Sequence, residues 1–155
     1  MRLILVRHAK AESRDKWVNK DDLKRPLTKK GIKQAKQIAK FIKKKYPNVD
    51  AIVSSLAIRA CDTAKFIAKK QPHCTFLLTP NINPEEGIEG FLRDKDRLEE
   101  SWQTLVIVGH NPSISELVRF ISAKGTLNLR VGKGCVVELE HDNDDNWMLV
   151  GLNNF

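Results

Sequence analysis

Arg7 and His8 follow directly on the apolar run Leu3–Val6 and carry side chains that could act on a phosphate group. A short apolar run that stops at charged residues indicates a buried strand ending in a loop. In open α/β sheets, loops at the carboxyl ends of parallel strands are where ligands bind. The planar guanidinium of Arg7 can donate parallel hydrogen bonds to phosphate oxygens. His8 could act there as a nucleophile, as an acid or base, or as a metal ligand.

Three further segments place polar residues where a strand ends or a helix begins. The run Ala51–Val53 leads into a helical segment that contains Arg59, and the run Leu105–Val108 leads into His110. The segment Arg25–Thr28 opens the first predicted helix. Because the carboxyl ends of parallel strands meet at one edge of a sheet, we expect these side chains to lie near His8.

Together these residues suit phosphoryl transfer, which needs an in-line nucleophile and fixed positive charge around three oxygens. His8 could be the nucleophile, because an unprotonated imidazole is available near pH 7. Arg7, Arg59 and a protonated His110 could hold the oxygens, each contact contributing roughly 1.5–3 kcal/mol. The sequence has neither a His/Asp/Cys cluster at zinc spacing nor a Gly-x-x-x-x-Gly-Lys loop. We therefore expect a site that uses no metal and no cofactor.

In this order, the motifs resemble the histidine phosphatase superfamily and, within it, the short bacterial phosphohistidine phosphatases of the SixA type. The family's Arg-His-Gly stands here as Arg7-His8-Ala9, its second arginine as Arg59 and its second histidine as His110. The resemblance covers nearly the whole chain. It implies a phosphoglycerate mutase-like fold, a covalent phosphohistidine intermediate on His8, and a phosphohistidine-bearing protein as substrate in signal transduction.

Two further residues are predicted to bind the substrate. The Arg-Pro-Leu-Thr element of the short branch stands as Arg25–Thr28, which implies that Arg25 contacts the phosphate or the substrate. The alternative is that Arg25 is simply a surface residue. Asn111 follows His110 and could orient that histidine or its loop.

The sequence departs from the family at two positions. Ala9 replaces glycine, which adds a methyl group and restricts positive φ, and we expect an intact site after a modest backbone adjustment. Asn81 stands where many relatives carry an acidic proton donor, and an amide cannot give up a proton. Glu85 and Glu86 lie close by and read as acids of a helix's first turn.

Two other functions compete with a protein phosphohistidine phosphatase. A phosphatase for small phosphate esters could use the same scaffold, and the missing carboxylate argues against it. A non-catalytic phosphoprotein-binding module could use the basic pocket, but it would need only the arginines and not His8.

The composition is that of one globular domain, residues 1–155, with 41% hydrophobic and 30% charged residues. No apolar run approaches the roughly 18 residues of a membrane span. Three cysteines without a Cys-x-x-Cys pair favour a reducing cytoplasm. We expect a cytoplasmic monomer that does not bind membranes.

The formal net charge of +8 is concentrated in residues 1–48, which hold 16 Lys/Arg and four Asp/Glu. Many of these lysines, among them Lys36, Lys40 and Lys43, fall on one face of the first helix. That face could simply be solvated, or it could dock an acidic surface of a phosphorylated protein. Because no aromatic residues are interleaved for base stacking, we expect no nucleic-acid partner.

Alternating strands and helices predict a three-layer α/β/α fold with a largely parallel sheet, helices on both faces and antiparallel edge strands. Helices are expected over residues 28–45, with Thr28 as the cap, over 58–70, from Asn83, and from a capping box at Ser113. The inward faces should hold Ile32 on the first helix and Ile58 on the second. Strands are expected at 51–53, 75–78 and 105–108, and the tail should form a hairpin around residues 141–146.

Overall fold

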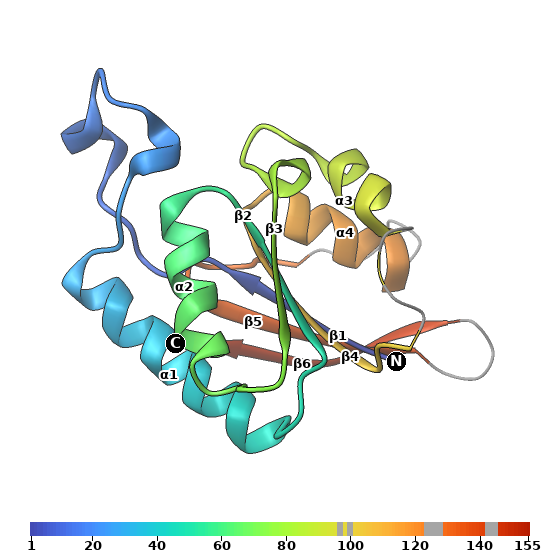
Figure 1. The fold of residues 1–155 in the computed structure, drawn as a ribbon. Coiled ribbons are helices and arrows are strands. Elements are labelled where there is room, and N and C mark those ends of the chain that lie inside the picture. Colours follow the sequence, from blue (N-terminus) through green and yellow to red (C-terminus); the bar gives the residue numbers. More distant parts are fainter. Residues whose placement is uncertain (96–97, 99–100, 123–128, 142–145) are drawn as a thin grey trace.

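The computed structural model describes residues 1–155 except 96–97, 99–100, 123–128 and 142–145 (Figure 1). The strands of the described residues are β1 (Arg2–Arg7), β2 (Ala51–Ser55), β3 (Thr75–Thr79), β4 (Thr104–Gly109), β5 (Cys135–His141) and β6 (Trp147–Asn154). The helices are α1 (Lys29–Lys45), α2 (Ile58–Ala68), α3 (Ile88–Lys95) and α4 (Ser113–Ser122). Short 3-10 turns are η1 (Arg14–Trp17), η2 (Asp22–Lys24) and η3 (Pro80–Ile82).

One mixed sheet with the strand order β3-β2-β4-β1-β5-β6 forms the middle layer. The pairs β3–β2, β2–β4 and β4–β1 are parallel, whereas β5 pairs antiparallel with β1 and with β6, as predicted for the edge of the sheet. Most of the predicted hairpin turn, residues 142–145, lies outside the described residues. Helices α1 and α2 lie over one face of the sheet, and α3 and α4 lie over the other (Figure 1). The predicted three-layer α/β/α architecture is confirmed.

Side chains of the central strands alternate between two separate cores. In β1, Leu3 and Leu5 pack on the side of α4, whereas Ile4 and Val6 pack on the side of α1 and α2. Because both faces of the sheet are covered, the interior of β1 is the continuous apolar run Leu3–Val6, with an arginine at each end of the strand. None of the helices in the described part of the chain has the length and hydropathy to span a membrane.

The N-terminus of α1 fixes the loop that follows β1. Thr28 caps the helix as predicted, its hydroxyl accepting a hydrogen bond from the Gly31 amide at 3.0 Å. The Lys10 carbonyl accepts from the Thr28 amide, also at 3.0 Å, and lies against Gly31 so closely that a Cβ there would stand 1.9 Å from it. Glycine at position 31 therefore lets the loop after β1 rest directly on the helix.

Four details of the predicted elements are wrong. Helix α3 begins at Ile88 rather than at Asn83, because the Asn83 side chain accepts hydrogen bonds from residues 55 and 56 instead of capping a helix. Helix α4 begins at Ser113 itself, so this serine is not its cap. Ile32 and Ile58, expected inward, are 37% and 38% exposed: Ile32 lies at the margin of the buried face of α1, and Ile58 is the first residue of α2 and lies on the side away from its buried residues.

Candidate active site

His8 and His110 lie side by side at the carboxyl ends of two neighbouring parallel strands. Arg7 is in register with Gly109, so the two histidines are the next residues of β1 and β4. The His8 amide donates to the Gly109 carbonyl at 3.0 Å, and the two imidazole centroids are 5.0 Å apart. The predicted convergence of these two residues is therefore found in the structure.

The contacts of His8 leave one ring nitrogen free to attack. Nδ1 lies 2.8 Å from the Ala9 carbonyl oxygen, and because a carbonyl can only accept, Nδ1 carries the proton. Burial lowers the pKa of His8 well below its usual 6.5, with His110, Arg59 and Arg7 acting in the same direction against the Ala9 carbonyl. Nε2 of a neutral His8 therefore holds an unshared electron pair near pH 7.

Ala9 does not distort the loop that holds His8. Among the described non-glycine residues, Asn19 is the one with a positive φ, so Ala9 lies in a conformation open to any L-residue. The Ala9 amide donates to the Thr63 hydroxyl at 3.2 Å, and the methyl group is fully buried. Alanine is therefore accommodated where the family has glycine.

A serine and an asparagine fix the orientation of His110. The Leu56 amide and the Ser55 hydroxyl both donate to Asn83 Oδ1, at 3.0 and 2.9 Å. The Ser55 oxygen is thus left to accept from His110 Nε2 at 2.9 Å, which leaves Nδ1 as the free ring nitrogen.

Without a bound anion, the surroundings of His110 favour its neutral ring, whereas the predicted imidazolium concerns the site with phosphate bound. Burial lowers the pKa of His110 to about 3, and repulsion by Arg59, Arg7 and Arg25 lowers it in the same direction. The three nearby guanidinium groups are therefore the fixed positive charge of the site. The described residues contain no group of three His, Cys, Asp or Glu side chains that could hold a metal ion.

Two arginines present donors with no acceptor in the described part of the protein. Arg59 is 1% exposed, and its Nε is buried without a hydrogen-bond partner. Arg7 donates from Nη1 to the Val131 carbonyl at 2.8 Å, and its Nε is likewise buried and unpartnered. An unsatisfied buried donor costs about 1–3 kcal/mol, so an oxyanion beside both atoms would be bound favourably.

Asp22 bridges Arg59 and Arg25. Its Oδ2 accepts from Arg59 Nη2 at 2.9 Å, and its Oδ1 accepts from Arg25 Nε at 3.0 Å. Burial raises the pKa of Asp22, but attraction to Arg59 and Arg25 outweighs this and the pKa lies below its usual 3.8. Arg25 is itself buried, with Nη1 on the Glu12 carbonyl at 2.7 Å, which contradicts the surface alternative. Its contact with substrate stays a prediction.

Asn111 is tied to the same carbonyl as Arg7. Its Nδ2 donates to the Val131 carbonyl at 2.8 Å, while Oδ1 is buried without a partner among the described residues. The amide thus helps to hold the strand-end segment around Arg7. Phosphate dianion oxygens only accept hydrogen bonds, so Oδ1 could serve a substrate only through a donor on its leaving group.

The side chain of Asn81 is hydrogen-bonded to helix α3. Its Nδ2 donates to the buried carboxylate of Asp94 at 2.7 Å. Glu86 forms an ion pair with Arg93, and the exposed Glu85 reaches Asn83 Nδ2 at 3.5 Å. Glu85 is therefore linked to His110 through Asn83 and Ser55, whereas the partly buried Glu86 is engaged by Arg93.

Sequence reasoning missed three residues of this site, namely Asp22, Ser55 and Asn83. Ser55 ends the strand β2 and Asp22 precedes Arg25 by three residues, so both stood next to recognised motifs. Their positions in the sequence do not show that Ser55 binds His110 or that Asp22 binds Arg59, because short polar side chains are common at strand ends and turns. Asn83 was interpreted as a helix cap, which is its usual role before proline and acids.

The two buried histidines should make folding stability fall below neutral pH. Their native pKa values are lowered, so below pH 6.5 the unfolded chain takes up protons that the native protein does not. Each can lower the free energy of unfolding by up to ~1.4 kcal/mol per pH unit as the pH falls. Denaturant unfolding at pH 6.5 and at pH 4.5 measures this change. Between these two pH values the free energy of unfolding should decrease less in the His8→Asn/His110→Asn variant than in the wild-type protein. The exposed His73→Asn change is the control, and equal losses in all three proteins would contradict the assignment.

Comparison with known proteins agrees with this geometry. The family model of the histidine phosphatase superfamily (branch 1) matches residues 3–83. An uncharacterised protein of Picosynechococcus sp. is 30% identical over 136 residues, covering 84% of this chain and 80% of that protein. A structure assigned as the phosphohistidine phosphatase SixA of Agrobacterium tumefaciens superposes with a TM-score of 0.84 at 21% identity, covering 99% and 97% of the two chains. The alpha-ribazole phosphatase of Shigella flexneri gives 0.79 at 18% identity, covering 99% and 96%.

Proposed function

This chain belongs to the histidine phosphatase superfamily, and we propose that it removes the phosphoryl group from phosphohistidine on a protein by way of a covalent intermediate on His8. The observation that supports this most directly is the pair of unpartnered Nε–H donors, on Arg7 and Arg59, in the same site as a histidine with a free Nε2. A nucleophile and an oxyanion site together are what phosphoryl transfer needs.

In the first step, Nε2 of His8 attacks the phosphorus atom of the substrate. The new N–P bond forms as the bond between phosphorus and the substrate imidazole breaks, and that imidazole leaves with the electron pair and takes up a proton. Arg7 and Arg59 hold the equatorial oxygens, where charge stabilisation by prearranged donors is strongest. In the second step, the oxygen of water attacks the phosphorus as the bond between His8 Nε2 and phosphorus breaks. The electron pair returns to Nε2, phosphate leaves, and a proton of the attacking water passes to phosphate or solvent, which restores neutral His8.

His110 would gain a proton when the phosphoryl group binds. In the unliganded site the arginines and burial keep it neutral, and a phosphoryl dianion would offset that positive charge. Since Ser55 engages Nε2, the added proton would lie on Nδ1. An imidazolium formed in this way would donate to a phosphoryl oxygen, and the predicted cationic role of His110 thus belongs to the occupied site.

The site should prefer P–N over alkyl P–O bonds. An alkoxide has a conjugate acid nearly as weak as water and needs a proton as it leaves, whereas imidazole has a conjugate acid near 6.5. Asn81 has no titratable proton and is engaged by Asp94, so only the less basic leaving group departs readily. We expect kcat/KM to decrease from phosphohistidine to an aryl phosphate and then to an alkyl phosphate, by tenfold or more at each step. Phosphate release from one enzyme preparation measures all three.

The same assay separates the competing functions. An alkyl ester that matches phosphohistidine in kcat/KM would favour the small-ester phosphatase and make Glu85 the first candidate for the acid. Tight binding of phosphohistidine without turnover would favour a binding module. Acid-quenched reactions with a labelled phosphohistidine protein should trap label on His8, and a turning-over enzyme that never carries label would exclude the covalent route.

A further inference from the structure

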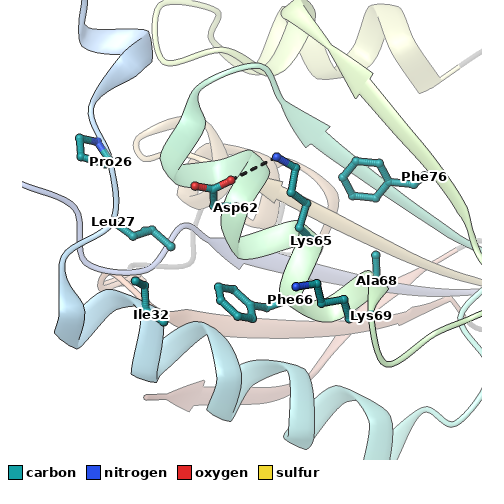
Figure 2. Close-up of a pocket in the computed structure, with 9 residues that line it drawn as sticks. All are labelled: Pro26, Leu27, Ile32, Asp62, Lys65, Phe66, Ala68, Lys69 and Phe76. Carbon is teal, nitrogen blue, oxygen red and sulfur yellow. Dashed lines mark hydrogen bonds and ion pairs between the residues drawn. The ribbon is translucent and has the colours of Figure 1, made fainter.

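An apolar groove of about 570 Å³ lies between helices α1 and α2 and the edge strand β3 (Figure 2). Leu27, Ile32, Phe66 and Phe76 contribute apolar side chains to it from four different elements. Ile32 also borders a second hollow of about 650 Å³ along α1, which is lined otherwise by lysines, so this side chain lies between the two hollows. Exposed apolar surface of this kind, rimmed by charge, is typical of a site where another chain binds.

The rim of this groove is strongly basic. Lys65 of α2 and Lys69, the C-cap of that helix, border the groove, and the neighbouring hollow along α1 is bordered by Lys29, Lys30, Lys33 and Lys36. Lys36 and Lys69 approach the Phe66 ring from the two helices, with Nζ 5.9 and 5.6 Å from the ring centroid. The single acid of the lining, Asp62, is paired with Lys65 at 3.3 Å. Among the described residues the other five lysines form no ion pair, so the rim is complementary to a partner's carboxylates.

The groove begins next to the active site. Pro26, at one end of it, is bonded to Arg25, which shares Asp22 with Arg59. Along α2, Lys65 follows Arg59 by six residues, or about 9 Å at 1.5 Å per residue. An extended chain advances about 3.3 Å per residue, so a segment whose phosphohistidine enters the site would reach the groove about three to six residues away.

We propose that this groove binds the substrate protein itself, through an acidic segment with large apolar side chains located about three to six residues from the phosphohistidine. This inference rests on the proposed function and adds the region of the substrate that the enzyme recognises. Apolar anchors of the segment fill the space around Ile32 and Phe66, and its carboxylates face the lysines of α1 and α2. A second copy of this chain is disfavoured, because it would bring the same basic face against the groove.

Two phosphohistidine peptides of equal length test this proposal. One carries Leu and Glu at positions three to six from the phosphohistidine, and the other carries Ser and Gln there. The groove variant is Ile32→Ser/Lys36→Gln/Lys69→Gln. The matched control is Val150→Ser/Arg2→Gln/Lys44→Gln, which likewise removes one apolar side chain and two positive charges, at exposed residues that do not line the groove. Phosphoramidate serves as a small substrate that cannot reach the groove while it is in the active site.

The wild-type protein and the control variant should hydrolyse the Leu/Glu peptide with a kcat/KM at least tenfold higher than the Ser/Gln peptide, and 0.5 M NaCl should reduce this ratio. The groove variant should lose the preference and hydrolyse phosphoramidate at the wild-type rate. Equal rates on both peptides for the wild-type protein, or a preference that survives in the groove variant, would overturn the proposal.

Other occupants of the groove would give different results. A dT20 oligonucleotide could inhibit hydrolysis of the Leu/Glu peptide more strongly than the unphosphorylated peptide does. If the groove variant relieved this inhibition, nucleic acid rather than an acidic segment would be the ligand of the groove. If the wild-type protein were a dimer at 100 μM and the groove variant a monomer, a second copy of this chain would be the ligand of the groove. If the wild-type protein hydrolyses neither phosphoramidate nor either peptide, the proposed function fails, and this outcome differs from all the others.

Discussion

Replacing His8 by alanine should abolish turnover and leave no labelled protein after acid quenching. The imidazole is the protein group that forms the bond to phosphorus in the proposed reaction, and alanine offers no electron pair in its place. The fold should persist, because His8 follows β1 in a loop and alanine removes a neutral ring that makes its one side-chain hydrogen bond to the adjacent carbonyl. Initial rates on phosphohistidine and circular dichroism of the same samples test both parts.

The exposed residue His73 provides the control for this substitution. His73→Ala should retain the wild-type rate, since the side chain lies in the turn between α2 and β3. A His8→Ala protein with a rate within tenfold of wild type would remove His8 from the role of nucleophile.

Replacing Arg59 by alanine should lower kcat by roughly 10²–10³-fold, the usual effect of removing one prearranged oxyanion donor. Arg59 is the most deeply buried cation of the site, and its Nε is an unpartnered donor. Binding of vanadate, which resembles the transferring phosphoryl group, should weaken in parallel. The His110→Ala substitution should lower kcat by a similar factor, since it removes the imidazole that would take up a proton and donate it to a phosphoryl oxygen when the dianion binds.

Arg119 on α4 is a matched control for Arg59, because it lies on the helix layer opposite α2 and hydrogen-bonds to the Ser115 carbonyl of its own helix. Arg119→Ala should change kcat less than threefold. Asp22 retains Arg25 as a partner in the Arg59→Ala protein, so the turn η2 should stay in place. Unchanged rates in both Arg59→Ala and His110→Ala would mean that the phosphoryl group binds elsewhere.

Local sequence patterns predicted the elements of this fold because their signals are local. Thr28 caps α1 through an amide three residues away, and the apolar runs that became β1, β2 and β4 are bounded by polar residues in the sequence itself. The start of α3 was wrong because Asn83 has a partner 28 residues away in Ser55, and no local pattern records it. The prediction that Ile32 is buried was wrong for a related reason. Helical periodicity identifies the apolar face of a helix but does not show how much of that face the neighbouring elements cover.

The same distinction applies to the candidate site. Arg7, His8, Arg59 and His110 could be found from the sequence because each follows a strand or opens a helix at the same edge of the sheet. The bridging role of Asp22 could not be found, since it depends on how the segment before α1 folds back over Arg59 on α2. The neutral state of His110 is likewise a property of burial among three arginines, which residue type alone does not determine.

The position of β1 in the sheet has a consequence for how the chain folds. β1 is inserted between β4 and β5, so Leu5 pairs with Ile107 on one side and with Val137 on the other. During synthesis the first strand therefore waits for both neighbours, which at 5–20 residues per second takes roughly 7–27 s. Until then the backbone N–H and C=O groups of this strand are unpaired and its apolar side chains are uncovered, so it is prone to wrong association. Since the two histidines become neighbours only when β1 and β4 pair, recovery of activity on refolding should not precede the pairing of these two strands.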